Sequence, residues 1–246
     1  MTAYWDDRHR PWPVPDLPWI MKQTWNDLLF AHWPIRPEAL RRLVPGSLPI
    51  DTYDGWGWIG VVPFDMTGIR MRGMPPIPLT DRFPELNVRT YVTIDGKPGV
   101  YFFSLDAANW LAVKLARAFY HLPYIYARME VKRRREIISY KSVRANGAPG
   151  AFQAAYRPIS DAFLASPGSI EEWLTERYCL YTLNGSGQPC RCDILHPPWP
   201  LRLAEAEFFM NTMTSAQGIA VEETKPLLHF ASTIDVRIWP LLRVRS

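Results

Sequence analysis

The sequence predicts one strand-rich domain of the all-β or α+β class, folded as a barrel or a sandwich. The 246 residues include 24 prolines spread along the chain, and proline breaks helix interiors. Turn signals recur between short apolar runs, and only residues 106–120 show a long helical pattern. Since no repeat or linker divides the chain, we expect a single domain over residues 21–246.

Residues 1–20 form an arm rich in proline and tryptophan ahead of this domain. Such a composition favours an extended, polyproline-like chain over a helix or a strand. We expect its indole rings to pack either on the body of the protein or on a second subunit.

Short strands joined by tight turns account for most of the domain. The dipeptides Asp54-Gly55, Asp95-Gly96 and Asn146-Gly147 are typical of turns between strands. Residues 201–217 are ambiguous, because alternating Leu and Glu favour a strand while the aromatic residues have helical spacing. The expected strands lie within residues 48–66, 85–93, 100–104, 125–144, 151–157, 178–183, 191–195 and 230–239.

Three helices are expected among these strands. Residues 37–44 carry a short apolar stripe that begins with a proline and ends before Pro-Gly. A capping box that starts at Ser169 begins another short helix. Residues 106–120 form the longest helix, with Ser104 or Asp106 as its cap and a wide apolar face.

Charge and cysteine content restrict the class of protein. The 28 basic and 24 acidic residues give a net charge of +4, which is too small to indicate nucleic-acid binding. The run Lys132–Arg135 is typical of a solvated hairpin edge, with an anion- or nucleic-acid-binding patch as the alternative. Three cysteines and a polar N-terminus predict a reducing, cytoplasmic location without disulfides. No apolar run reaches the roughly 20 residues that span a bilayer.

Common catalytic and metal-binding motifs are absent from the sequence. It contains no P-loop, dinucleotide-binding glycine fingerprint, His-Glu-x-x-His or Gly-x-Ser-x-Gly motif. Cys190, Cys192 and His196 form part of a zinc pattern without a second pair, so we expect no metal and no cofactor. His32, His121 and His196 occur in contexts that favour packed imidazoles over catalytic bases.

The most informative polar residues are Glu85, Asn87, Arg89 and Tyr91. If they lie in a strand, its period of two places all four on one face and their apolar neighbours on the other. That face is either exposed to solvent or lines a cavity in which buried polar groups satisfy one another. The neighbouring run 100–103 is apolar on both faces, which favours the cavity.

Eight motifs in a fixed order carry a resemblance to a known family, from about Trp25 to the C-terminus. They are residues 29–33, 51–55, 62–64, 84–92, 104–107, 122–124, 175–178 and 196–201. Together they resemble the YqjF-like family of uncharacterised bacterial proteins, in the acetoacetate decarboxylase-like superfamily. This resemblance implies an α+β domain that contains a β-barrel with an internal pocket, and implies that Glu85 points into it.

The resemblance also implies that the superfamily's Schiff-base chemistry is absent from this chain. Acetoacetate decarboxylases use a Schiff-base lysine, whose neutral amine attacks the substrate. The matching position here is Tyr124, and a phenol cannot form an imine. Glu85 resembles that family's pocket glutamate and Arg117 its helix arginine, which implies a pocket that has lost its nucleophile. From its position alone, Arg117 can instead stabilise a helix C-terminus through the helix dipole.

Three functions are compatible with these residues. The preferred one is binding of a small carboxylated or carbonyl-containing molecule, since arginine grips a carboxylate through two hydrogen bonds. The second is a lyase or hydratase in which Tyr124 acts as acid and Glu85 as base. The third is a non-catalytic interaction protein that uses the arm and the basic run. A homo-oligomer is compatible with each, while membrane and nucleic-acid partners are not expected. The ligand-binding candidates are Glu85, Asn87, Arg89, Tyr91, Arg117 and Tyr124.

Overall fold

The computed structural model describes residues 6–76, 78, 80–221 and 224–244. Strands dominate this part of the chain. The strands are β1 (Met21–Ile35), β2 (Gly57–Met71), β3 (Phe83–Ile94), β4 (Lys97–Ala107), β5 (Tyr124–Arg134), β6 (Ile137–Arg144), β7 (Ala151–Pro158), β8 (Cys179–Leu183), β9 (Pro189–Leu195), β10 (Arg202–Asn211) and β11 (Leu227–Arg243). The helices are α1 (Pro37–Arg41), α2 (Trp110–Tyr120) and α3 (Ile170–Thr175), with a short 3-10 helix at Ser215–Gln217.

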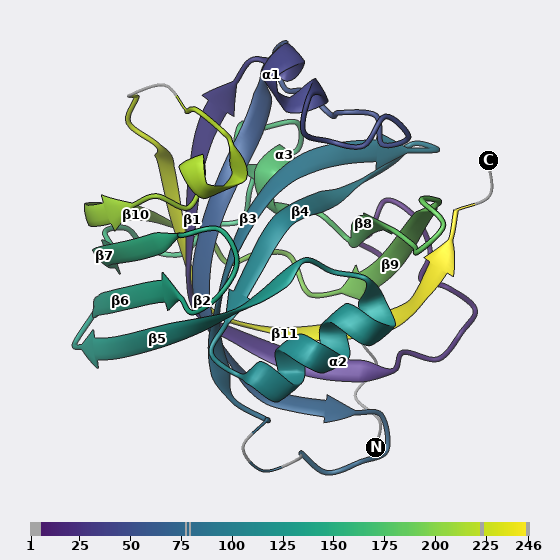
Figure 1. Ribbon diagram of the computed structural model, residues 1–246, viewed down its shortest axis with the longest axis horizontal. Helices are drawn as coiled ribbons and strands as arrows, with labels where there is room; N and C mark the ends of the chain where they lie inside the picture. The colour runs from purple at the N-terminus through teal and green to yellow at the C-terminus, as the bar shows by residue number, and fades with distance from the viewer. Residues whose placement is uncertain (1–5, 77, 79, 222–223, 245–246) are drawn as a thin grey trace.

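The strands form one sheet that curls back on itself (Figure 1). Its order is β1-β2-β3-β4-β5-β6-β7-β10-β11-β9-β8, and further pairings join β1 to β11 and β4 to β8. The strands β1, β2, β3, β4, β8, β9 and β11 therefore make a ring. The β4–β8 contact is parallel and pairs only Val100 with Leu180 and Tyr101 with Tyr181, so the ring is not a regular closed barrel. The predicted strand-rich α+β fold is confirmed in this irregular form.

The β3–β4 hairpin separates two interiors. Leu86, Val88 and Val92 pack into a core cluster with residues of β1, β6 and β7, while alternate residues of β3 face the inside of the ring. The hairpin turns at Asp95 and Gly96, whose positive φ angles of 51° and 67° match the two-residue turn predicted there. The predicted alternation of polar and apolar faces along β3 is confirmed.

Strand β1 was not predicted from the sequence. Met21, Gln23 and Trp25 point to the inside of the ring, but beyond Asp27 it is the even-numbered Leu28 that does so. Asp27 has a φ of 50°, and the pairing of β1 with β2 is irregular around it. A β-bulge adds one residue and reverses the alternation of side chains. The bulge therefore removes the period of two by which a strand is recognised in a sequence.

The longest helix begins later than predicted. Strand β4 continues to Ala107, so Ser104 and Asp106 lie in the strand and neither caps α2. Asn109 is the cap, and its Oδ1 accepts hydrogen bonds from the backbone N–H groups of Leu111 and Ala112 at 3.1 and 3.0 Å. The predicted apolar face is present, but Phe119 on it is 71% exposed.

Other boundaries also differ from the prediction. The helix expected at residues 37–44 ends at Arg41, and residues 48–53 form isolated bridges rather than a strand. The ambiguous residues 201–217 contain a strand, β10, followed by a 3-10 turn. The short helix α3 starts as predicted, since the Ser169 hydroxyl accepts a hydrogen bond from a backbone N–H inside the helix.

Residues 6–20 of the arm contain no helix or strand and pack on the body of the domain. Arg10 and Asp193 form an ion pair at 3.0 Å, with side chains that are 0% and 1% exposed. The Trp12 indole donates to the same carboxylate at 2.9 Å, and the Trp239 indole donates to the Leu17 carbonyl at 2.7 Å. The arm thus contacts its own domain, while residues 1–5 of the predicted arm lie outside the described residues.

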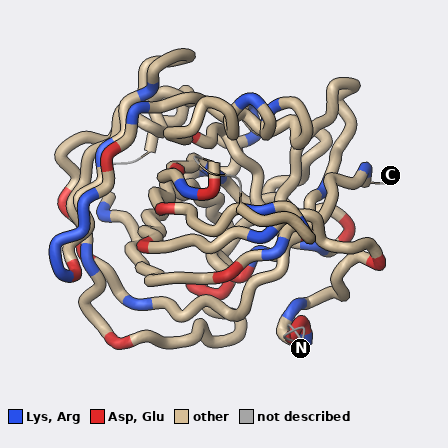
Figure 2. The backbone as a smooth tube through the Cα atoms, turned by 90° about the horizontal axis from the view of Figure 1, so that it is seen from below, with Lys and Arg blue, Asp and Glu red and all other residues tan. Residues whose placement is uncertain are grey.

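The basic run Lys132–Arg135 lies at the exposed turn between β5 and β6, where it is a continuous blue segment at the edge of the molecule (Figure 2). Lys132 pairs with Glu130, and Arg133 pairs with Asp27 at 2.7 Å. These contacts match the solvated hairpin edge expected from the sequence. Among the described residues, no helix is long and apolar enough to cross a bilayer.

Candidate functional site

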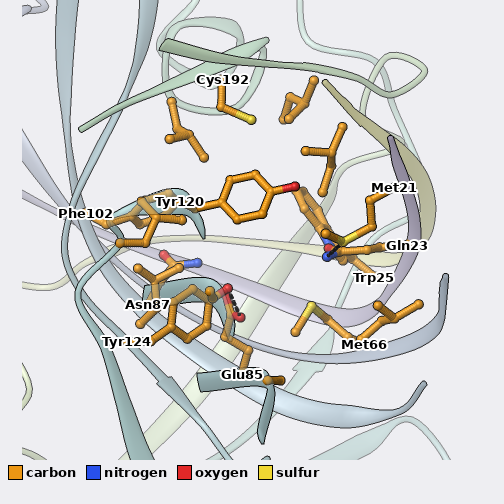
Figure 3. A pocket seen from close by; sticks show the side chains of 18 of the residues that line it. Met21, Gln23, Trp25, Met66, Glu85, Asn87, Phe102, Tyr120, Tyr124 and Cys192 are labelled. Carbon is orange, nitrogen blue, oxygen red and sulfur yellow. Dashed lines mark hydrogen bonds between the residues drawn. The ribbon is translucent and has the colours of Figure 1, made fainter. Parts of the chain in front are cut away.

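A cavity of about 660 Å³ lies inside the ring of strands, beside α2. Most of its lining consists of aromatic, aliphatic and methionine side chains from β1, β2, β4, α2, β9 and β11. Figure 3 shows Trp25 and Met66 on one side of the cavity and the Tyr120 ring extending into its middle. This size and this apolar character are typical of sites that bind small organic molecules.

Strand β3 supplies a polar strip to this cavity through Glu85, Asn87 and Arg89. Glu85 is 3% exposed and Asn87 is 4% exposed, so both side chains are removed from bulk water. The Oδ1 atom of Asn87 has no hydrogen-bond partner among the described residues. A buried acceptor without a partner is costly in a folded protein, and a bound ligand can satisfy it.

Glu85 and Tyr124 form a hydrogen-bonded pair at the bottom of the cavity, as the dashed line in Figure 3 shows. The Tyr124 hydroxyl donates to Oε2 of Glu85 at 2.8 Å. Burial raises the pKa of Glu85 to about 8, although the hydrogen bond from Tyr124 acts in the opposite direction. Burial and the nearby Glu85 raise the pKa of Tyr124 well above its ordinary value. At pH 7 both groups are therefore predominantly protonated and neutral.

Arg89 carries a positive charge that no acidic side chain neutralises. Among the described residues no carboxylate lies within 4.0 Å of its guanidinium, and its Nε atom has no hydrogen-bond partner. Its guanidinium carbon lies 5.3 Å from the Phe30 ring centre and 5.6 Å from the Tyr91 ring centre. The guanidinium also donates a long hydrogen bond of 3.4 Å to the Leu174 carbonyl.

Arg177 is a second cavity arginine, but it has an acidic partner. It is 5% exposed, and its Nη1 donates to Asp51 at 2.7 Å. Its guanidinium carbon lies 4.9 Å from the same Tyr91 ring that Arg89 contacts. Its Nη2 has no partner among the described residues. Arg177 therefore has one unused hydrogen-bond donor, and the Arg177–Asp51 pair carries no net charge.

The buried histidines near the cavity are neutral. Burial lowers the pKa of His196 to about 4, and burial followed by the charge of Arg89 lowers that of His32 well below its usual value. His196 stacks on Tyr178 with ring centres 4.6 Å apart, as expected for a packed imidazole. His121 does not follow this expectation, because it is an exposed left-handed residue that ends α2.

Four of the six predicted ligand-binding residues line the same cavity: Glu85, Asn87, Arg89 and Tyr124. Tyr91 lies on the same face of β3 but is not among the residues that line the cavity, and its hydroxyl is 2.6 Å from Nε2 of His32. Arg117 is exposed on α2 and does not line the cavity. On α2, Ala112, Ala116 and Phe119 line the cavity and share one side of the helix. At about 100° per residue, Arg117 projects from the other side.

Several polar lining residues were not found by sequence reasoning. Arg177 and Trp199 come from distant parts of the chain, and Tyr120 comes from the apolar side of α2. The Trp199 indole N–H and the Tyr120 hydroxyl have no hydrogen-bond partner among the described residues. Only the Thr175–Tyr178 and His196–Leu201 motifs marked these segments in the sequence, and neither motif indicated a side-chain direction.

The partial zinc pattern does not form a metal site in the described residues. No group of three or more His, Cys, Asp or Glu side chains there is arranged to hold a metal ion. Cys190 and Cys192 are free, buried thiols, and burial raises the pKa of both.

Residues 22–235 match the DUF2071 family, described as "Uncharacterized conserved protein (COG2071)". The chain belongs to this family. It is also 54% identical over 228 residues to "Uncharacterized protein YqjF" of Bacillus subtilis (strain 168), covering 93% of this chain and 94% of that protein. The resemblance stated from the sequence motifs is thereby confirmed.

Solved structures with a similar fold come from the acetoacetate decarboxylase-like group. "Enduracididine biosynthesis enzyme MppR complexed with pyruvate" matches with a TM-score of 0.64 and 11% identity, covering 92% of this chain and 91% of that one. An acetoacetate decarboxylase-like enzyme from Sphingomonas wittichii RW1 matches with a TM-score of 0.64 and 12% identity, covering 96% and 99%. The acetoacetate decarboxylase from Legionella pneumophila matches with a TM-score of 0.62 and 12% identity, covering 97% and 94%. At these identities the likeness shows the fold alone.

Proposed function

We propose that this DUF2071 family protein binds a small carboxylated molecule in the cavity, with the carboxylate on Arg89. The observation that carries the proposal is the charge balance of the lining. Glu85 is the only Asp or Glu among the described lining residues, and with a pKa of about 8 it does not neutralise Arg89 at pH 7. Of the three arginines in the described lining, Arg177 is paired with Asp51 and Arg70 is exposed, so Arg89 is the partly buried positive charge without an acidic partner.

An anionic ligand would remove the electrostatic cost of that charge. A partly buried cation without a partner is expensive, because the low-dielectric surroundings replace its hydration poorly. A carboxylate that accepts hydrogen bonds from Arg89 would neutralise it. The Arg177 guanidinium, which has one nitrogen without a partner among the described residues, lies near the same Tyr91 ring. Asn87 would then meet a neutral polar group of the ligand, such as a hydroxyl, at its free acceptor.

Schiff-base chemistry is not part of this proposal. None of the described residues that line the cavity is a lysine, and the position that resembles the decarboxylase lysine is Tyr124. Lys114 lies on the exposed side of α2, with its Nζ 4.9 Å from the Trp110 ring centre. Pyruvate is bound in the structure of MppR, and it is the first carboxylate to test here because of the shared fold.

A second candidate is an enzyme that transfers a proton next to a carbonyl group. It is favoured by the Glu85–Tyr124 pair, since a carboxyl with a pKa of about 8 is suited to proton transfer near neutral pH. The acid and base roles differ from those expected from the sequence, in which Tyr124 was the acid and Glu85 the base. Glu85 is the more acidic partner and is protonated at pH 7, so it would act as the acid, with Tyr124 holding it in place.

We also propose that the protein is located in the cytoplasm. All three cysteines, Cys179, Cys190 and Cys192, are free and buried, as is usual for proteins kept under reducing conditions. A homo-oligomer, predicted from the sequence as compatible with any of the functions, stays a prediction that size-exclusion chromatography with light scattering can test.

Titration calorimetry with pyruvate and butyrate at pH 7 tests carboxylate binding. Wild type is expected to bind both, and Arg89→Gln to bind them about 10- to 100-fold more weakly, the loss typical of one charged hydrogen-bonded partner. Arg117→Gln is the matched control, because this arginine lies outside the cavity, and it should bind like wild type. Absence of binding to wild type, or equal losses in the two variants, would contradict the proposal.

A further inference from the structure

The charged end of the cavity is small compared with its apolar part. Beyond the β3 strip, the walls are formed by Trp25, Phe64, Met66, Phe102 and Tyr120 together with further aliphatic side chains. Figure 3 shows Trp25, Met66 and Tyr120 around the same open space that the Glu85–Tyr124 pair borders. A ligand as small as pyruvate would leave most of the 660 Å³ to water held between apolar walls, which is unfavourable.

The spacing along β3 fixes how far apart the polar contacts are. Alternate residues of a strand are about 7 Å apart, so Asn87 lies about 7 Å and Glu85 about 13 Å from Arg89 along the strand. All three face the cavity, so one extended molecule can run along the strip. Its carboxylate would meet Arg89, and its other end would lie near the neutral Glu85–Tyr124 pair.

We infer that the ligand is an amphipathic monocarboxylate, with one carboxylate on Arg89 and an aliphatic or aromatic body of medium length along the apolar walls. The inference rests on the proposed function and deepens it by naming the ligand class. One carboxylate suffices, because Arg177 is already paired with Asp51 and because burial raises the pKa values of Glu85 and Tyr124, which keeps the far end of the strip uncharged at pH 7.

The cavity contains a rival position for the carboxylate. Arg70 also lines the cavity but is exposed, as is its neighbour Met71 at 41%. A fatty acid could bind with its carboxylate at Arg70 and its chain inside. Arg70 is hydrated and needs no ligand to neutralise it, whereas Arg89 is partly buried without an acidic partner, so Arg89 is the favoured position.

A chain-length series of butyrate, hexanoate and octanoate tests this inference by calorimetry at pH 7. Each methylene buried in the apolar part should tighten binding about fourfold, so octanoate should bind about 200-fold more tightly than butyrate. Arg89→Gln should weaken binding by a similar factor at every length, while Arg70→Gln should have little effect. Octanol, which has the chain but no charge, should bind far more weakly than octanoate.

Two matched variants on α2 probe the position of the chain. Ala116 lines the cavity, so Ala116→Phe should leave butyrate binding intact and remove the gain from the longer chains. Ala118 is exposed on the other side of the same helix, and Ala118→Phe should preserve the whole series. Thermal unfolding of each variant confirms that it is folded before binding is compared.

The outcomes separate this inference from the proposed function. If butyrate and octanoate bind equally well and both depend on Arg89, carboxylate binding stands and the amphipathic class is overturned. If no carboxylate binds, both are overturned. If octanol binds as tightly as octanoate, or if Arg70→Gln rather than Arg89→Gln weakens the series, the assignment of the carboxylate to Arg89 is wrong.

Discussion

The buried Glu85 makes the stability of the ligand-free protein depend on pH in a defined direction. Burial raises its pKa from 4.5 to about 8 in the folded protein. The unfolded chain therefore releases this proton at lower pH than the folded one, and the folded state binds more protons between these values. Stability due to the neutral carboxyl is complete below pH 4.5 and is lost as the pH rises through 8.

The magnitude follows from the same two values. One pKa unit corresponds to about 1.4 kcal/mol, so the full loss above pH 8 is about 5 kcal/mol. Of this, about 3 to 4 kcal/mol falls between pH 5 and pH 8. Glu85→Gln keeps an acceptor for the Tyr124 hydroxyl but cannot ionise, so it should lack this part of the pH dependence.

Urea unfolding followed by tryptophan fluorescence at pH 5, 6, 7 and 8 measures the effect. The difference in unfolding free energy between Glu85→Gln and wild type should grow by about 3 to 4 kcal/mol in favour of the variant from pH 5 to pH 8. Glu205→Gln is the control, since this exposed carboxylate should leave the slope unchanged. Parallel curves for wild type and Glu85→Gln would refute the neutral, buried state of Glu85.

Two further predictions concern contacts that hold the fold around the cavity. Asp193→Asn leaves the buried Arg10 guanidinium without its acidic partner and should lower the free energy of unfolding in urea by about 3 to 5 kcal/mol. Asp6→Asn is the control, because it breaks only an exposed ion pair and should not measurably change the free energy of unfolding. Equal effects of these two variants would count against docking of the arm. Gly99→Ala would place a Cβ 2.6 Å from Sγ and 2.8 Å from the carbonyl oxygen of Cys179, and should cost about 1 to 3 kcal/mol in the same assay. Wild-type stability of Gly99→Ala would show that β4 and β8 do not approach as closely as described.

Local patterns in the sequence were sufficient to predict β3, β4 and the set of side chains that share the polar face of β3. The turn at Asp95-Gly96 fixes the hairpin, and the strict alternation from Glu85 onward fixes which side chains share a face. Both features depend on neighbours in the chain, so no knowledge of the tertiary fold was needed.

Other features depend on contacts that local patterns do not encode. The bulge at Asp27 reverses the alternation of β1 and conceals the strand. Arg117 was a candidate only through the family resemblance, and it falls outside the cavity because Ala112, Ala116 and Phe119 line the cavity from the other side of α2. Arg177 reaches the cavity only because β8 pairs with β4, a pairing between segments about 80 residues apart that no short motif predicts.

The most direct test of carboxylate binding at Arg89 is a crystal structure of the protein with octanoate. The carboxylate should lie within about 3 Å of the Arg89 guanidinium, and the chain should extend between Phe64, Met66 and Tyr120. A carboxylate bound at Arg70, or octanoate found only outside the cavity, would contradict the proposed role of the unmatched charge.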